Sequence, residues 1–367
     1  MPENSIHSTL RETFSLSNKE NWKRFASQEL DGKNPDEILS WNSEDQLIFF
    51  AYYDASDEEK NFLSPKFQLA VAGDPYFGPA KWLNIPCVTV TSEKSANQTA
   101  LQHLTNGADG ILFKINGKVN LDNLLAGVEW RYCSLFFQSA DPENLIADVS
   151  LYTINHKLSS QEISGGFIWD STPDFNNRIL FRTGLKNILS VAPSTSVNEI
   201  AAALSHGVTF FEQSQAQSEE FFKSIAFSMP VGTLFLESIA RLKALRFLWY
   251  QVAQAYGYSS YQISDLHIHV RSDKWIDEQF QPHGNMLKST IASMASVIGG
   301  ANAITIEAED ESNTMMTRIA RNVSTLLREE SNLDKVSDPT AGAFAIEVMT
   351  KEFAKHAWKS FQDKQKK

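Results

Sequence analysis

Short apolar runs recur along the chain from residue 87 onward, separated by segments long enough to form helices. Such runs, bounded by turn residues, are typical of parallel strands that are buried on both faces. Eight strands alternating with helices predict an α/β fold, a (β/α)8 TIM barrel. A doubly wound open sheet is disfavoured, because no Gly-x-Gly-x-x-Gly or Gly-x-x-x-x-Gly-Lys turn follows any run. The predicted strands are 87–90, 110–115, 134–137, 166–170, 188–191, 208–211, 266–270 and 303–306.

Apolar residues spaced three and four apart predict several helices in the C-terminal half. The pattern covers 233–256, where Gly257 is expected to end the helix, and recurs over 287–298 and 316–330. We expect Asp338-Pro339 to start the last helix, with Asp as N-cap and Pro at the first helical position.

The first 78 residues form a separate region. Their polar, helix-like sequence predicts a helical extension and linker, and we expect Trp22, Phe25 and Leu30 to be its buried anchors. A loop rich in Gly and Pro spans 73–79 and marks the boundary. The predicted organisation is therefore an extension over 1–78 and a barrel over 79–367.

Composition narrows the functional classes. Lys+Arg 33 against Asp+Glu 44 gives a net charge of -11, which argues against nucleic-acid partners and anionic membranes. Cys87 and Cys133 can form neither a disulfide scaffold nor an all-cysteine zinc site. We find no signal-peptide pattern and no apolar run of membrane-spanning length, so a cytoplasmic protein is expected.

His267 and His269 are the sharpest local chemical feature. At positions i and i+2 of a predicted strand they share one face, where they could share a metal or simply line the barrel. Asp170, at the end of a predicted strand, is expected at the barrel mouth. Asp265-Leu266-His267 begins like the cobalamin signature Asp-x-His-x-x-Gly, but Val270 occupies the glycine position.

Several short sequence motifs follow one another in the C-terminal third of the chain. Residues 240–249 read Ala-Arg-Leu-Lys-Ala-Leu-Arg-Phe-Leu-Trp, and 285–300 run from Asn-Met-Leu-Lys-Ser-Thr to Gly-Gly. Ala-Arg-Asn at 320–322, Glu-Glu-Ser at 329–331 and Asp-Pro-Thr-Ala-Gly at 338–342 follow. In order and spacing these motifs resemble those of the methylmalonyl-CoA mutase family, and the similarity covers about residues 20–360.

The resemblance implies a barrel of the cobalamin-dependent acyl-CoA mutases, which interconvert methylmalonyl-CoA and succinyl-CoA by a radical rearrangement. The family's catalytic chain joins such a barrel to a C-terminal cobalamin domain, and we see no trace of that domain here. We therefore expect this chain to bind no cofactor, with adenosylcobalamin held by a partner.

The chain departs from the family pattern at positions that carry chemistry. Residues 76–83 lack the substrate-side Thr-Met-Tyr and Arg-Pro-Trp-Thr, retaining only Trp82, and 191–195 lack the family's Tyr-His pair. His267 occupies an Arg position, which removes a permanent charge that could hold an anion. No catalytic residue is therefore assigned, although His267, His269, Arg271 and Asp170 remain candidates at the barrel mouth.

These departures imply a noncatalytic small subunit. It would form a heterodimer with the large catalytic mutase subunit and stabilise that subunit. Acyl-CoA would bind to the partner and not to this chain directly. Two alternatives remain open from the sequence. One is an acyl-CoA-binding barrel that works with a separate cobalamin chain, and the other is a metal-dependent hydrolase that uses His267 and His269.

Overall fold

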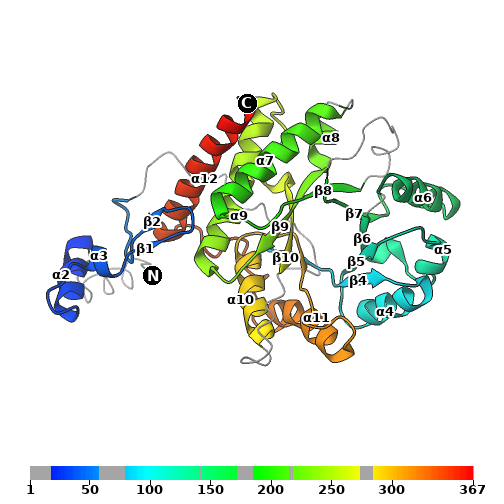
Figure 1. Cartoon of the computed structure of the whole chain (residues 1–367), viewed down its shortest axis with the longest axis horizontal. Coiled ribbons are helices and arrows are strands. Elements are labelled where there is room, and N and C mark those ends of the chain that lie inside the picture. Colours follow the sequence, from blue (N-terminus) through cyan, green and yellow to red (C-terminus); the bar gives the residue numbers. More distant parts are fainter. Residues whose placement is uncertain are drawn as a thin grey trace, which may run out of the picture.

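The protein is described by a computed structural model that covers residues 18–57, 79–139, 142–171, 185–214, 216, 218–272 and 284–366. Its dominant feature is a nine-stranded, all-parallel sheet in the order β3-β11-β10-β9-β8-β7-β6-β5-β4 (Figure 1). Its strands are β3 (Leu83–Asn84), β4 (Cys87–Val90), β5 (Gly110–Ile115), β6 (Ser134–Ser139), β7 (Ser164–Trp169), β8 (Lys186–Ser190), β9 (Ile225–Val231), β10 (His267–Ser272) and β11 (Ala303–Thr305).

The two end strands of this sheet are consecutive pieces of one barrel strand, interrupted at Pro86. On one side Leu83 N donates to Asn302 O at 2.9 Å, and Ile85 N donates to Ile304 O of β11 at 3.0 Å. On the other side Leu112 N donates to Pro86 O at 3.0 Å. Residues 83–90 are thus bonded to both β11 and β5, which closes the sheet into an eight-stranded barrel. The predicted (β/α)8 fold is confirmed.

One predicted strand was wrong. Residues 208–211 belong to helix α7 (Ser196–Gln213), and β9 takes the sixth place in the barrel. Gly207 lies inside α7 and, having no side chain, lets the helix approach its neighbours closely. A Cβ there would lie 2.6 Å from the Trp249 ring and 2.9 Å from Phe227. The apolar run that follows Gly207 continues the buried face of the helix.

Helices cover the outside of the barrel. The predicted helices over 233–256, 287–298 and 316–330 are confirmed as α9, α10 and α11. The last helix, α12, begins at Phe344 rather than Pro339, because Asp338 accepts hydrogen bonds from Lys243 and Thr340 in a turn of its own. The set comprises α4 (Glu93–Thr105), α5 (Leu121–Leu124), α6 (Pro142–Asn155), α8 (Glu219–Ser224), α9 (Phe235–Ala255), α10 (Gly284–Ile298), α11 (Thr314–Glu329) and α12 (Phe344–Gln365), with 3-10 turns at Trp130–Tyr132 and Ile263–Asp265. No helix in these described ranges is both long and apolar enough to cross a lipid bilayer.

The N-terminal extension has a helical part that stands away from the barrel and a hairpin that lies against the last helix (Figure 1). It contains α2 (Lys19–Glu29), α3 (Pro35–Ile38) and an unanticipated antiparallel hairpin of β1 (Trp41–Asn42) and β2 (Ile48–Phe49). The hairpin is anchored by Phe49, whose ring lies 5.6 Å from that of Phe353 on α12.

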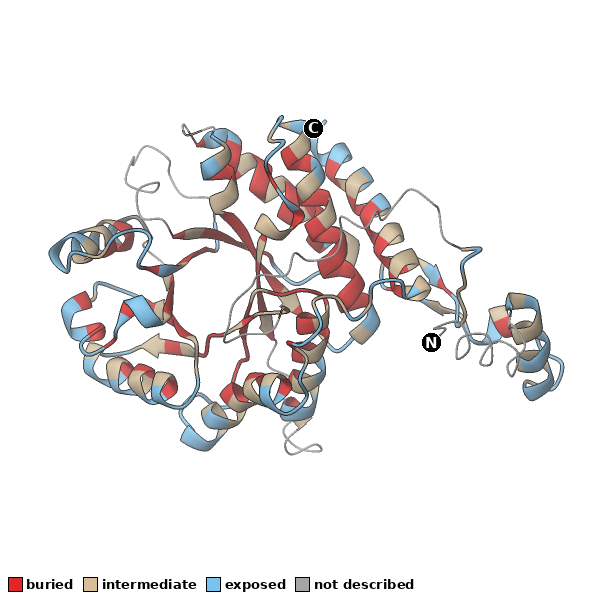
Figure 2. Cartoon of the chain, turned by 180° about the vertical axis from the view of Figure 1, so that it is seen from behind, coloured by how far each residue is buried: buried red, intermediate tan, exposed pale blue. Residues whose placement is uncertain are grey.

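Helix α2 itself buries no residue, so the expectation of buried anchors there was wrong. Phe25 is 59% exposed, Leu30 is half-buried, and Trp22 stacks on Tyr52 at 5.2 Å within the extension. Figure 2 shows the buried residues gathered on the barrel strands and on the inward faces of their helices.

Candidate functional site

Side chains from each barrel strand point into the middle of the barrel. Alternate residues of each strand face inward, and seven of these inward residues form one buried apolar cluster. Strand β10 alone contributes no apolar member and places His267 and His269 there instead. Both imidazole rings stack on Phe136, at 6.3 and 6.5 Å between centroids, so they share one face as predicted. The apolar residues are Ile85, Leu112, Phe136, Ile168, Ile188, Ala226 and Ala303.

His269 is completely buried, and both of its ring nitrogens are engaged. Nε2 lies 2.9 Å from Thr305 Oγ1, whose hydroxyl donates to Ile85 O at 2.8 Å, so Nε2–H is the donor. Nδ1 lies 2.8 Å from Ser228 Oγ and accepts its hydroxyl proton. Burial, followed by the charge of Arg271, holds the pKa of His269 well below its usual value. His269 is therefore a neutral link between strands with no lone pair left for a metal.

His267 is also neutral. Burial is the main cause that lowers its pKa to about 3, with the charges of Lys186 and Arg246 adding to it. Its Nε2 has no hydrogen-bond partner in the part of the chain that the structure describes. Across the same residues, no group of three His, Cys, Asp or Glu side chains could hold a metal ion.

The carboxyl ends of the strands carry a polar rim. Lys114 Nζ lies 3.1 Å from Glu307 Oε1, and this carboxylate is only 6% exposed. Burial lowers the pKa of Lys114, but Cys87 and Glu307 outweigh that effect and raise it overall. Burial raises the pKa of the Cys87 thiol to about 12, so no thiolate is available there. The Lys114 ammonium is therefore part of an ion pair.

The other candidates also lie at this rim. Asp170 is exposed at the end of β7 and accepts a hydrogen bond from Gln138 Nε2 at 2.8 Å. Arg271 is half-buried near the end of β10. Sequence reasoning missed the pair of Lys114 and Glu307. Its one visible signal is a lysine inside the apolar run Gly-Ile-Leu-Phe-Lys-Ile.

The cations of helix α9, within the motif at 240–249, are structural. Arg246 is 2% exposed and donates to the carbonyls of Leu266 at 2.6 Å and Gly300 at 2.7 Å. It also reaches Ile263 O at 3.2 Å and Asn302 Oδ1 at 2.9 Å. One side chain therefore joins α9 to the turn before β10 and to the Gly-Gly turn before β11.

Two further cations on the same helix have partners of their own. Arg241 forms a buried ion pair with Glu199 of α7 and donates to Pro230 O at 2.5 Å. Lys243 contacts Asp338 at 2.9 Å and thereby fixes the Asp-Pro turn before α12. The resemblance between motifs therefore falls on buried charge networks that hold the helices to the barrel.

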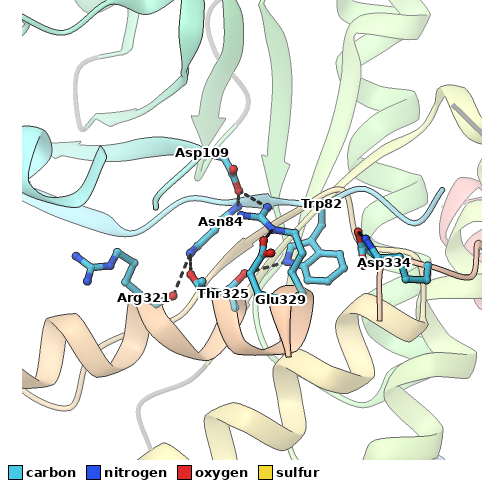
Figure 3. Close-up of polar contacts among 10 residues, drawn as sticks. Trp82, Asn84, Asp109, Arg321, Thr325, Glu329 and Asp334 are labelled. Carbon is cyan, nitrogen blue, oxygen red and sulfur yellow. Dashed lines mark hydrogen bonds and ion pairs between the residues drawn. The ribbon is translucent and has the colours of Figure 1, made fainter. Parts of the chain in front are cut away.

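Helix α11 is fixed to the first barrel strand by a second polar group, the seam cluster of Asn84, Asp109, Arg321, Thr325 and Arg328 (Figure 3). Asn84 Nδ2 donates to Arg321 O at 3.0 Å and to Thr325 Oγ1 at 3.3 Å. Arg328 Nη1 lies 2.9 Å from Asp109 Oδ2, which also accepts from Asn84 N at 2.7 Å. The seam cluster secures the junction at which the barrel closes.

Trp82, the one aromatic residue retained from the family's substrate-side segment, serves the same junction. It is fully buried, and its Nε1 donates to Ser324 Oγ of α11 at 2.8 Å. Its role in this structure is packing.

The sequence of the chain is similar to those of known proteins. The family model described as methylmalonyl-CoA mutase matches residues 183–367. A methylmalonyl-CoA mutase small subunit from Porphyromonas gingivalis is 28% identical over 307 residues, 72% of this chain and 49% of its own length. That from Streptomyces virginiae is 31% identical over 185 residues, 47% of this chain and 29% of its own.

The chain spans half or less of the length of these relatives. The methylmalonyl-CoA mutase of Escherichia coli is 27% identical over 173 residues, 45% of this chain and 24% of its own. Among solved structures, dihydropteroate synthase from Yersinia pestis is similar with a TM-score of 0.38 and 14% identity, covering 67% of this chain and 93% of its own.

Proposed function

Because the chain belongs to the methylmalonyl-CoA mutase family, we propose that it is the noncatalytic small subunit of a mutase that interconverts methylmalonyl-CoA and succinyl-CoA. Its role is to bind and stabilise a large catalytic subunit in a cytoplasmic heterodimer. That partner holds adenosylcobalamin, and acyl-CoA meets this chain only through the partner.

The apolar and uncharged side chains of the barrel interior carry this proposal. A radical rearrangement needs a secluded space in which the thioester and the cofactor can meet. Here seven apolar side chains and two neutral imidazoles occupy the middle of the barrel. His269 is further held by hydroxyls of the strands on both sides.

The charges in and around the interior support the same proposal. His267 stands where the resemblance places an arginine, and its pKa of about 3 leaves it uncharged at neutral pH. The Lys114 ammonium at the rim is paired with Glu307. Neither group offers the unpaired positive charge that holds an anionic or thioester oxygen in place.

The barrel also does not fit a cobalamin. His267, the histidine of the Asp265-Leu266-His267 sequence, lies inside the barrel against Phe136 and cannot reach a cobalt ion outside it. His269 uses both nitrogens within the protein. No step is therefore assigned to the cofactor on this chain.

The N-terminal extension, which we assign to residues 1–78 beside a barrel over 79–367, offers a surface for the partner. Apolar side chains are exposed along it, including Phe25 at 59%, Ile38 at 52% and Ile48 at 59%. Exposed apolar side chains on a projecting segment are available for contact with another protein.

Co-expression with the full-length catalytic subunit tests the proposal. We expect the two chains to co-purify in equal amounts, and the isolated chain to retain no cobalamin. Stoichiometric cobalamin on the isolated chain would overturn the noncatalytic role. Failure to associate with the catalytic subunit would overturn the role of a subunit.

The acyl-CoA-binding barrel is the second candidate, favoured by Lys114 and Arg271 at one rim. Specific ligand binding raises the melting temperature by mass action. A rise with succinyl-CoA that the Lys114→Met and Arg271→Gln substitutions abolish would establish this candidate. The primary proposal expects no rise that depends on these two residues.

A further inference from the structure

A large groove lies outside the barrel, between helices α4 and α11. Its volume is about 970 Å³, and its floor includes residues of β4. These two helices flank the first barrel strand, one after β4 and the other after β11 (Figure 1). The walls are rich in hydroxyls and amides, among them Ser95, Thr99 and Gln102 of α4 and Thr314 and Thr317 of α11.

Two arginines of α11 give the groove positive charge. Arg318 and Arg321 are one helical turn apart, and both line it. Figure 3 shows the Arg321 guanidinium turned away from Asn84 and Asp109, so only the backbone carbonyl of Arg321 takes part in the seam cluster. Its hydrogen bonds within the described ranges go to Asn322 Oδ1, at 3.1 and 3.3 Å. Glu311 supplies the one carboxylate among the lining residues, so cations outnumber anions locally in a chain of net charge -11.

A buried imidazole lines the facing wall. His103 of α4 is 5% exposed, and its Nδ1 has no hydrogen-bond partner among the residues that the structure describes. Burial, followed by the charge of Arg321, lowers its pKa to about 4, so the ring is neutral. An unsatisfied buried polar atom is costly. Because His103 is one of the lining residues, a polar ligand in the groove is a candidate partner for this nitrogen.

We propose that this groove binds a phosphorylated small molecule, with Arg318 and Arg321 contacting the phosphate and His103 contacting a polar group of the ligand. Guanidinium groups pair with phosphate through parallel, charge-assisted hydrogen bonds. The volume lies within the range of small-molecule sites, and the hydroxyls and amides suit the polar remainder of such a ligand.

This proposal does not depend on the proposed function as a noncatalytic subunit. That function is argued from the residues of the barrel interior, whereas the groove lies outside the barrel. An acidic segment of another protein would satisfy the same arginines. The enclosure of His103 between two helices favours a small ligand over a peptide, and the experiment below distinguishes the two.

Isothermal titration calorimetry of the full chain with ADP and with inorganic pyrophosphate, in metal-free buffer, tests the proposal. We expect one saturable site for each ligand, weaker binding at higher salt, and no binding of adenosine. Each of Arg318→Gln and Arg321→Gln is expected to weaken binding by about tenfold, the cost of one charge-assisted hydrogen bond. His103→Phe should weaken ADP more than pyrophosphate.

Arg131→Gln is the matched control, because Arg131 is an exposed arginine paired with Glu162 outside the groove. Circular dichroism of each variant confirms that it is folded. Failure of both ADP and pyrophosphate to bind at millimolar concentration would overturn the proposal, as would unchanged binding in the double variant Arg318→Gln/Arg321→Gln. Binding of a poly-glutamate peptide, lost in that variant, without binding of ADP would overturn it in favour of a protein partner.

Discussion

Helix α9 and strand β10 both bury polar side chains, but they do so in opposite ways. Arg246 of α9 stays charged, since burial lowers its pKa only to about 10, and it has four acceptors around it. His269 of β10 is neutral and is bonded to two hydroxyls. Charge therefore persists where it ties α9 to its neighbours, and it is absent from the two histidines that face the barrel interior.

The largest effect is expected at Arg246. Replacement by Met would leave the carbonyls of Leu266 and Gly300 buried without their donor. We expect a loss of about 2–6 kcal/mol in the free energy of unfolding, from about 1–3 kcal/mol for each carbonyl left without a donor, measured by urea denaturation. The control is Arg131→Met, at an exposed arginine, which should change stability by no more than about 0.5 kcal/mol. If Arg246→Met and Arg131→Met lower the free energy of unfolding equally, the hydrogen bonds of Arg246 do not stabilise the fold.

The ion pair of Glu199 and Arg241 gives the next effect. Glu199→Gln leaves a buried guanidinium without its counter-charge and should cost about 3 kcal/mol. Replacing both residues, Glu199→Gln with Arg241→Met, should cost less than either single change. A double-mutant cycle measures this, and simple additivity of the two costs would refute the pairing.

The histidines make stability depend on pH. The pKa of His269 in the folded state is lowered, so between pH 6.5 and the lower folded pKa the unfolded state binds the extra proton. The free energy of unfolding should therefore fall as pH falls, by about 2 kcal/mol at pH 5 for this residue alone. His269→Gln should flatten the curve measured by denaturation across pH 5–8. A slope that is the same in His269→Gln and in the unmodified chain would contradict a neutral His269.

The smallest effect on stability is expected in the extension. Phe25→Ser and Ile48→Ser alter side chains that are each 59% exposed, so unfolding of the isolated chain should change by no more than about 0.5 kcal/mol. Association with the catalytic subunit, measured by calorimetry, should weaken. If association is unchanged, the extension is not part of that interface.

Much of the fold was readable from apolar runs, because parallel barrel strands are buried on both faces. Residues 208–211 were wrongly predicted as a strand because a glycine such as Gly207 commonly ends a helix. Here Gly207 instead packs closely on Trp249, and that contact cannot be read from the local sequence because the two residues are distant in sequence. The shared face of His267 and His269 followed from strand periodicity. Their neutrality did not, since it depends on the surrounding strands. Lys114 and Glu307 are 193 residues apart, so nothing local could pair them.

The most direct test of the noncatalytic role is the turnover of a reconstituted complex. The catalytic subunit would be paired with this chain carrying both Lys114→Met and Arg271→Gln, and kcat and KM for methylmalonyl-CoA would be measured per assembled complex. The account predicts values equal to those of the unmodified complex. A fall in kcat at equal assembly would contradict it, because it would place chemistry in this barrel.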